Sequence, residues 1–409
     1  MKTMSTRPVS RFTDDEPFAL VGMILGTGPD AGSNLGAAAP GAVIVEAGRI
    51  ADVLVNPDTR ALPSRRLCAA YVAPGFIDLQ VNGGFGYEVE DDPAALAALA
   101  RRLPATGVTA FLPTLVTREA GRYARCFAAF DAARAASDGH GARLLGLHLE
   151  GPLLAPERAG AHARAAIEGA TAALLEQLAD PCRVSLVTLA PERPEALPLI
   201  GRLRARGIVV SLGHTDASFE LFTAGVDAGA TLATHVWNAM SPLRHRTPGA
   251  TGAALSDDRV TALAIADGVH THPAAFAIAW RAKGRDRLGL VTDAVAAAGV
   301  AVGTITALAG RPVSTDGTSA RLDDGTLAGS ILTMDRAVRN ARRFAGLSPA
   351  EAVHLSTAVP ARALGLLGAG PLVRAGAAAD LVLLDQQLEV QATLVGGHLA
   401  FQRADTTWA

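Results

Sequence analysis

The sequence predicts an α/β protein whose core is a parallel (β/α)8 barrel of the TIM type, accompanied by a small β-sandwich domain. Eight short apolar runs alternate with alanine-rich helical segments between residues 73 and 367, and this alternation is typical of a parallel sheet closed into a barrel. Four of the runs end on a carboxylate or an imidazole. Short β-like runs occur in residues 18–72 and again in 368–409, so we expect both termini to build the small domain.

The composition excludes several classes of protein. The 409 residues contain 37 Lys and Arg against 39 Asp and Glu, a net charge of −2, so we expect neither a nucleic-acid binder nor a membrane-surface binder. The three cysteines, Cys68, Cys126 and Cys182, form no Cys-x-x-Cys pair, which argues against a cysteine metal site and suits a reducing cytoplasm. No secretory signal or membrane-spanning run is recognisable. We therefore expect a cytoplasmic protein.

The two ends of the chain have a sequence pattern typical of a small sheet. Residues 1–17 are polar and charged, and we expect a disordered tail there. Short β-like runs follow, such as 42–46 and 49–55, separated by glycine-rich turns. Similar runs at 380–384 and 392–397 lie near the C-terminus. These runs predict one β-domain, with the catalytic body inserted between its two halves.

The barrel is predicted from eight apolar runs, which are residues 74–81, 108–115, 143–150, 184–189, 208–213, 231–236, 261–266 and 289–292. The helical segments between them include residues 93–102, 119–136, 170–178 and 194–206. An open doubly wound sheet is the alternative architecture. The first strand is not followed by a Gly-x-Gly-x-x-Gly turn, which weakens that alternative.

The ends of four strands carry the residues for metal chemistry. Glu150, His214, His235 and Asp293 each end a run, and the carboxyl ends of barrel strands open onto one face. One carboxylate and two imidazoles with an open position are the pattern of a catalytic divalent ion, and zinc suits this set first, although iron, manganese and cobalt also accept it. Asp293 is the natural base for a water activated there. His148 is expected to be a core or supporting residue rather than a ligand.

Several stretches in order resemble the amidohydrolase superfamily and, within it, the N-acetylglucosamine-6-phosphate deacetylases. They lie between about residues 70 and 340, and they read PGFIDLQVNG (74–83), LHLEGP (147–152), GHTDA (213–217), THVWNAM (234–240), ADGVH (266–270), VTDA (291–294) and LAGS (327–330). The resemblance implies hydrolysis of the acetamide of N-acetylglucosamine 6-phosphate, giving glucosamine 6-phosphate and acetate. The split β-domain also fits this superfamily.

The first strand ends differently from that of many amidohydrolases. Those enzymes carry His-x-His there and bind two metal ions, whereas this chain has Gln80, Val81 and Asn82. Neutral amides are poor ligands for transition metals. The family that this chain resembles includes a branch with this Gln-x-Asn version, which uses one metal ion. The resemblance therefore implies one metal ion per subunit, with Gln80 either beside the ion or its water, or acting only as a hydrogen-bonding support.

The resemblance also implies the residues that bind the substrate. Arg246 matches an arginine that binds phosphate in the neighbouring subunit's site, which implies a homodimer, and Arg244 is a further charge beside it. The guanidinium of an arginine suits phosphate because it donates two parallel hydrogen bonds. His162 is expected to polarise the carbonyl or to hold a hydroxyl. The other expected substrate contacts are Ala161, Asn238, Ala239, His270, Leu327, Ala328 and Gly329.

Three other readings remain open. An N-acetylgalactosamine-6-phosphate deacetylase would use the same chemistry, because the two sugars differ at one hydroxyl. A ring-opening amidohydrolase of the dihydroorotase kind is less favoured, since those enzymes commonly use paired metals and a carboxylated lysine. A non-catalytic scaffold of the same fold would be expected to lack ligands, whereas the three ligands and Asp293 are all present.

Overall fold

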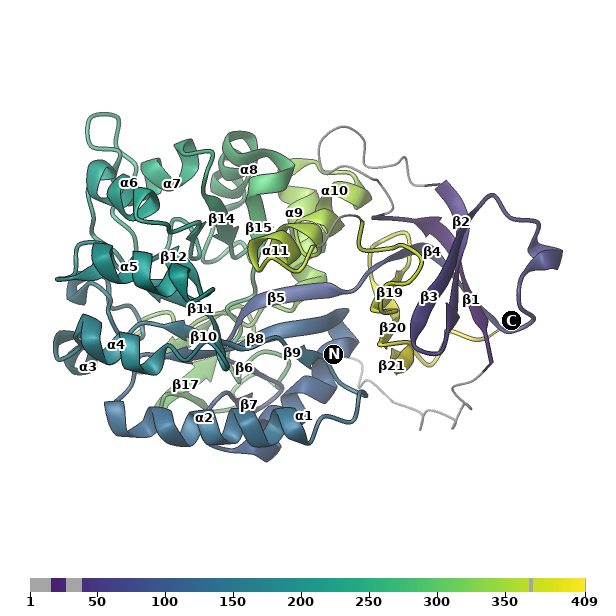
Figure 1. Ribbon diagram of the computed structural model, residues 1–409, viewed down its shortest axis with the longest axis horizontal. Coiled ribbons are helices and arrows are strands. Elements are labelled where there is room, and N and C mark those ends of the chain that lie inside the picture. Colours follow the sequence, from purple (N-terminus) through teal and green to yellow (C-terminus); the bar gives the residue numbers. More distant parts are fainter. Residues whose placement is uncertain (1–15, 27–38, 368–370, 409) are drawn as a thin grey trace.

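The computed structural model describes residues 16–26, 39–367 and 371–408. Figure 1 shows a barrel of strands surrounded by helices, with a separate sheet at one side that contains the first and the last strands of the chain. Residues 1–15 of the expected disordered tail lie outside the described part, as do 27–38 of the expected β-domain. No helix of the described residues is long and apolar enough to cross a bilayer.

Eight parallel strands form the barrel; six lie within runs predicted from the sequence, and β8 and β15 each extend one residue beyond theirs. In spatial order they are β5 (Phe76–Val81), β8 (Val108–Val116), β10 (Leu147–Glu150), β11 (Val184–Leu189), β12 (Val209–Leu212), β13 (Leu232–Ala233), β14 (Thr261–Ala264) and β15 (Leu288–Leu290), with β9 (Arg143–Leu144) beside β8. All nine residues of β8 are buried. Burial on both sides is expected when helices cover the outside and side chains fill the inside.

Side chains and loop backbone bring the first and last barrel strands together. The carboxylate of Asp78, in β5, accepts hydrogen bonds from the Thr292 hydroxyl at 2.6 Å and from its N–H at 3.2 Å. The next N–H, of Asp293, donates to the Gln80 carbonyl at 2.9 Å. A parallel bridge between Val81 and Ala294 follows. The seam is therefore fixed at the carboxyl ends of the strands, where the expected site lies.

Helices connect most of the barrel strands. They are α1 (Pro93–Arg102), α2 (Ala120–Ala135), α3 (Arg164–Glu168), α4 (Ala172–Leu178), α5 (Ala196–Ala205), α6 (Phe219–Asp227), α7 (Gly249–Ser256), α8 (Pro273–Arg287), α9 (Met334–Ala345), α10 (Pro349–His354) and α11 (Ala358–Ala363). The sequence encodes α1 locally. Asp92 caps its first turn, Pro93 follows at a position that needs no N–H, and Leu96, Leu99 and Ala100 are buried on one face.

The two ends of the chain form one seven-stranded sheet. Its order is β21-β20-β19-β4-β1-β2-β3, and the strands are β1 (Phe18–Ile24), β2 (Ala39–Glu46), β3 (Arg49–Val55), β4 (Arg66–Pro74), β19 (Leu381–Leu384), β20 (Val390–Val395) and β21 (His398–Gln402). The halves meet where β19 pairs antiparallel with β4. After Gly75 the chain continues from β4 into β5, so this sheet is directly joined to the first barrel strand.

An insertion between β15 and α9 was not predicted from the sequence. It is a three-stranded antiparallel sheet of β16 (Thr306–Leu308), β17 (Arg311–Thr315) and β18 (Ala320–Leu322). A two-stranded ribbon, β6 (Gly83–Gly84) with β7 (Tyr87–Glu88), lies after the first barrel strand. The insertion has its own small apolar core, and it contributes to the wall of the cavity described next.

Candidate active site

A cavity of about 360 Å³ opens at the carboxyl ends of the barrel strands. Six of the eight strands, β5, β8, β10, β12, β13 and β15, place a residue at the strand end or shortly after it in the wall of this cavity. The lining residues are Asn82, Val116, Glu150, Glu157, Arg158, Gly160, Ala161, His162, His214, His235, Asn238, Ala239, His270, Asp293, Leu308, Thr326, Leu327 and Gly329. Most of the residues expected at the site are thus brought together, although in sequence they span about 250 residues.

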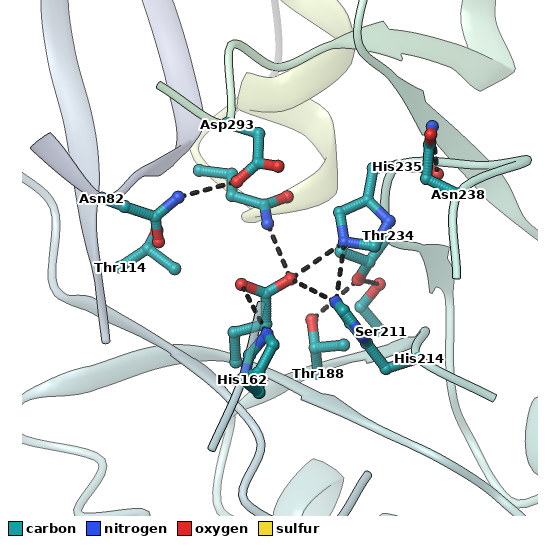
Figure 2. A network of polar contacts seen from close by, with 12 residues as sticks. Asn82, Thr114, His162, Thr188, Ser211, His214, Thr234, His235, Asn238 and Asp293 are labelled. Atoms are coloured by element: carbon teal, nitrogen blue, oxygen red, sulfur yellow. Dashed lines mark hydrogen bonds and ion pairs between the residues drawn. The ribbon is translucent and has the colours of Figure 1, made fainter. Parts of the chain in front are cut away.

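The three predicted metal ligands form a compact triangle. The Oε1 atom of Glu150 lies 2.9 Å from Nε2 of His235 and 3.2 Å from Nε2 of His214, and the two Nε2 atoms are 3.2 Å apart. Figure 2 shows both imidazoles directed at this point. Ligands about 2.1 Å from a tetrahedral ion lie about 3.4 Å from each other. The spacing therefore fits one ion, and this triad is the one cluster of such donors among the described residues.

The protonation of His214 supports the same conclusion. Nδ1 of His214 lies 2.7 Å from the Arg158 carbonyl, which only accepts, so Nδ1 carries the proton of the neutral ring. Its Nε2 therefore presents a lone pair toward the Glu150 carboxylate. A lone pair that faces a carboxylate and a second imidazole nitrogen needs a cation or a proton between them. Fixing a ligand's tautomer through its second ring nitrogen is common in metal sites.

The amides of Gln80 and Asn82 surround the triad. Nε2 of Gln80 donates to Oε1 of Glu150 at 2.8 Å, and Nδ2 of Asn82 donates to Oδ1 of Asp293 at 2.7 Å. Each amide orients a carboxylate. The buried Oε1 atom of Gln80 has no hydrogen-bond partner among the described residues, which leaves an acceptor available beside the triad. Gln80 itself is fully buried and does not line the cavity.

His162 is held as a hydrogen-bond donor. The Thr117 N–H donates to Nδ1 of His162 at 3.1 Å, so the neutral ring carries its proton on Nε2. That atom is 3.5 Å from Oε2 of Glu150, and the ring borders the cavity. Burial, followed by the charge of His214, lowers the pKa of His162 to about 4. A neutral Nε2–H beside the ligands can donate to a carbonyl oxygen in the cavity.

Asp293 lies just beyond β15, on the opposite side of the ligand cluster from His162 in Figure 2. Burial, and then the charge of Glu150, raises the pKa of the Asp293 carboxyl to about 6, against His235, His270 and the Asn82 hydrogen bond. A carboxylate with a raised pKa is a better proton acceptor. Its position and protonation suit the general base predicted from the sequence.

The loops after the strands hold the backbone of several of these residues in the left-handed conformation. His214 (φ 47°), His235 (φ 29°), Ala239 (φ 50°) and Asp293 (φ 49°) all have positive φ. Side chains with a Cβ seldom adopt this conformation, and it tends to persist where the surroundings impose it at functional sites. The turns after β12, β13 and β15 thus place these four residues in the wall of the cavity.

The expected substrate contacts divide into three groups. Ala161, Asn238, Ala239, His270, Leu327 and Gly329 line the cavity. Ala328 is fully buried in the core of the insertion and is not among the lining residues. Arg246 lines a neighbouring cavity of about 400 Å³ together with Arg244, and Arg158 is common to both cavities. Arg246 therefore does not reach the site of its own chain.

His148 lies beneath the triad, in the barrel interior. Its Nδ1 is 3.1 Å from the Leu79 carbonyl, so it donates there, and Nε2 accepts from the Thr188 hydroxyl at 2.7 Å. Thr188 continues to Thr234 at 2.7 Å, and Thr234 to Ser211 at 2.5 Å (Figure 2). Burial lowers the pKa of His148 to about 4. It belongs to this buried hydrogen-bond network rather than to the ligand triad, as expected.

Sequence reasoning missed residues that act on the site indirectly. Asp267 holds His270, whose Nδ1 donates to the carboxylate at 2.7 Å, and the Asp-x-x-His spacing was a usable signal. The Thr117 N–H that orients His162 had no sequence signal, because a backbone group carries no residue type. Val116 and Leu308 line the cavity, and their apolar side chains look like ordinary core residues in the sequence.

A sequence profile of the amidohydrolase family matches residues 71–400. The chain belongs to the amidohydrolase family. The human N-acetylglucosamine-6-phosphate deacetylase is 41% identical over 376 residues, which are 88% of this chain and 91% of the human protein. The Escherichia coli N-acetylgalactosamine-6-phosphate deacetylase is 39% identical over 335 residues, covering 81% of this chain and 88% of that protein.

Solved structures agree with this membership. A Mycobacterium smegmatis N-acetyl-D-glucosamine-6-phosphate deacetylase mutant, in complex with N-acetyl-D-glucosamine-6-phosphate, superposes with a TM-score of 0.85 at 33% identity and covers 94% of this chain and 100% of that chain. The resemblance predicted from the ordered motifs and the predicted barrel with a small β-domain are both confirmed, the β-domain being one seven-stranded sheet. The chain is an amide hydrolase.

Proposed function

We propose that this amidohydrolase removes acetate from N-acetylglucosamine 6-phosphate and releases glucosamine 6-phosphate. The observation that carries the proposal is the single cavity in which the ligand triad, Asp293 and the Nε2–H of His162 face the same point. The relatives named as deacetylases of phosphorylated N-acetyl amino sugars support the choice of substrate.

Glu150, His214 and His235 would hold one divalent ion, for which zinc is our first candidate. The ion supplies Lewis-acid stabilisation of negative charge and favours deprotonation of water. Asp293 accepts the proton of the attacking water, while Asn82 keeps its carboxylate oriented. His162 donates from Nε2 to the carbonyl oxygen as negative charge develops on it. Asp293 then returns the proton to the departing amine, which completes hydrolysis of the C–N bond.

Recognition of the phosphate is proposed to need a second subunit. Arg246 lies in a cavity outside the site of its own chain, which supports the proposal that it binds phosphate across a homodimer. Asn238, Ala239 and His270, which border the site cavity, would bind the same end of the substrate. The net charge of the whole chain is −2, so attraction for a phosphate must come from such local groups. We propose that the dimer works in the cytoplasm.

N-acetylgalactosamine 6-phosphate is the second candidate substrate. The similarity to the E. coli enzyme named for that sugar favours keeping it, because the identity of 39% is close to the 41% of the human enzyme named for the gluco sugar. The two substrates share the acetamide and the phosphate, so the mechanism is the same for both.

The proposal is tested by acetate release from the metal-loaded protein on both phosphorylated sugars and on unphosphorylated N-acetylglucosamine. We expect the highest kcat/KM on N-acetylglucosamine 6-phosphate. A preference for the galacto sugar would move the assignment to the second candidate. Equal rates with and without phosphate would contradict the role of Arg246, and no release from any of the three would refute the proposed deacetylation.

A further inference from the structure

The cavity beside the ligand triad has one apolar wall. Most of its other lining residues are polar or charged, among them Asn82, Glu157, Arg158, Asn238, His270 and Thr326. The wall consists of Val116, Ala161, Leu308, Leu327 and Gly329. The proposed proton transfers use no side chain of this wall, so its role must be sought in substrate fit.

The wall lies next to the groups that perform the chemistry. Val116 is paired with the ligand Glu150 on adjacent parallel strands. Ala161 precedes His162 in the chain. A Cβ placed on Gly329 would be 3.9 Å from Oδ1 of Asp293 and only 2.6 Å from Cγ1 of Val295, so the backbone there closely approaches the proposed base. An acyl carbon attacked between these groups therefore has the apolar wall beside it.

Leu308 is the largest wall residue that is fully packed. Its exposed fraction is 4%, and it belongs to a cluster with Val116, Val313 and Leu322 in the core of the insertion. The insertion is also tied to the His162 loop, because the Arg311 guanidinium donates to the Ala161 carbonyl at 3.1 Å. A packed side chain on an anchored sheet cannot retreat without cost.

We propose that the β16–β18 insertion, through Leu308, restricts the acyl group that this enzyme removes to acetyl. The inference rests on the proposed function. A phosphorylated N-acyl amino sugar is surrounded by hydroxyl and phosphate groups, and its acyl chain end is the group best matched to an apolar wall. A methyl group fits against Leu308, whereas each further methylene must displace it. The insertion is thus a specificity element.

The test compares acyl chains of increasing length. N-acetyl-, N-propionyl- and N-butyryl-glucosamine 6-phosphate give the same amine, so one assay of glucosamine 6-phosphate measures all three. The variants are Leu308→Ala and the smaller change Leu308→Val. Leu322→Ala is the matched control, because Leu322 has the same 4% exposure in the same cluster but does not line the cavity.

We expect Leu308→Ala to raise the ratio of kcat/KM for propionyl over acetyl by about 10-fold or more, the discrimination that one methylene gives in an apolar pocket. Leu308→Val should give a smaller rise, and Leu322→Ala should leave the ratio at its wild-type value even if it lowers stability. An unchanged ratio in both Leu308 variants, or an equal rise in the control, would overturn the inference. A wild-type protein that releases no amine from the acetyl substrate would instead overturn the proposed function.

Discussion

Replacing Asp293 with asparagine isolates the proposed proton transfer from metal binding. The side chain of Asp293 accepts from Nδ2 of Asn82 at 2.7 Å, and its backbone N–H donates to the Gln80 carbonyl at 2.9 Å. An asparagine has the same shape, and its Oδ1 can keep the bond to Asn82. Its other terminal atom then becomes an N–H donor that cannot accept a proton. Asp293 is outside the triad of Glu150, His214 and His235, so metal binding should persist.

The size of the effect follows from the two roles of the carboxylate. General acid–base catalysis typically contributes 10²- to 10⁴-fold, and Asp293 is proposed both to accept the proton of water and to return it to the amine. We therefore expect kcat to fall about 10³-fold, which corresponds to about 4 kcal/mol of transition-state stabilisation. The KM should change little, because the substrate contacts of the cavity remain.

The assay is steady-state acetate release, with metal content measured on the same preparations by elemental analysis. Asp323→Asn, an exposed carboxylate of the insertion, is the control and should retain wild-type kcat. If Asp293→Asn keeps its metal and its kcat stays within about 10-fold of the wild type, Asp293 is not the proton acceptor. A variant that has lost its metal would show that Asp293 contributes to metal binding, and this too would contradict the separation of roles.

Three further outcomes are expected. Arg246→Ala should raise the KM for the phosphorylated sugar at least about 10-fold, because a hydrogen bond to a charged group is worth about 1.5 kcal/mol or more. Mixing this variant with Asp293→Asn should restore activity, since a mixed dimer has one complete site, and no restoration would contradict a role across subunits. Asp267→Asn should raise the KM for the phosphorylated sugar with little change in kcat, because Asp267 orients His270 through the 2.7 Å bond. Turnover of the unphosphorylated sugar should stay unchanged, and a fall in kcat on both substrates would indicate a general structural defect. Burial raises the pKa of Asp78 to about 7 from about 3.9 in an unfolded chain, so its contribution to stability is fully present below about pH 4 and is lost as the pH rises through 7. Denaturant unfolding should show the wild type losing stability relative to Asp78→Asn over this range, and a difference independent of pH would argue against the raised pKa.

The insertion shows why part of the fold could not be predicted. Its strands are three to five residues long, and such runs carry too few positions to separate a strand from a loop. The barrel strands were easier, because each is an apolar run between helical segments. The burial of Ala328 was missed for the same reason as the insertion, since that residue packs against β-structure that the sequence did not reveal.

The sequence by itself predicted the barrel and the meeting of Glu150, His214, His235 and Asp293 at one face of it. This is possible because parallel strands direct their carboxyl ends to one face, so residues at strand ends converge without knowledge of the packing. Only the tertiary structure decided the protonation of His162 and His214. The Thr117 N–H and the Arg158 carbonyl that fix these rings lie 45 and 56 residues away in the chain, and backbone groups are identical in every sequence. The placement of Arg246 outside its own site and the apolar wall of Leu308 likewise depend on how loops pack, which no local pattern specifies.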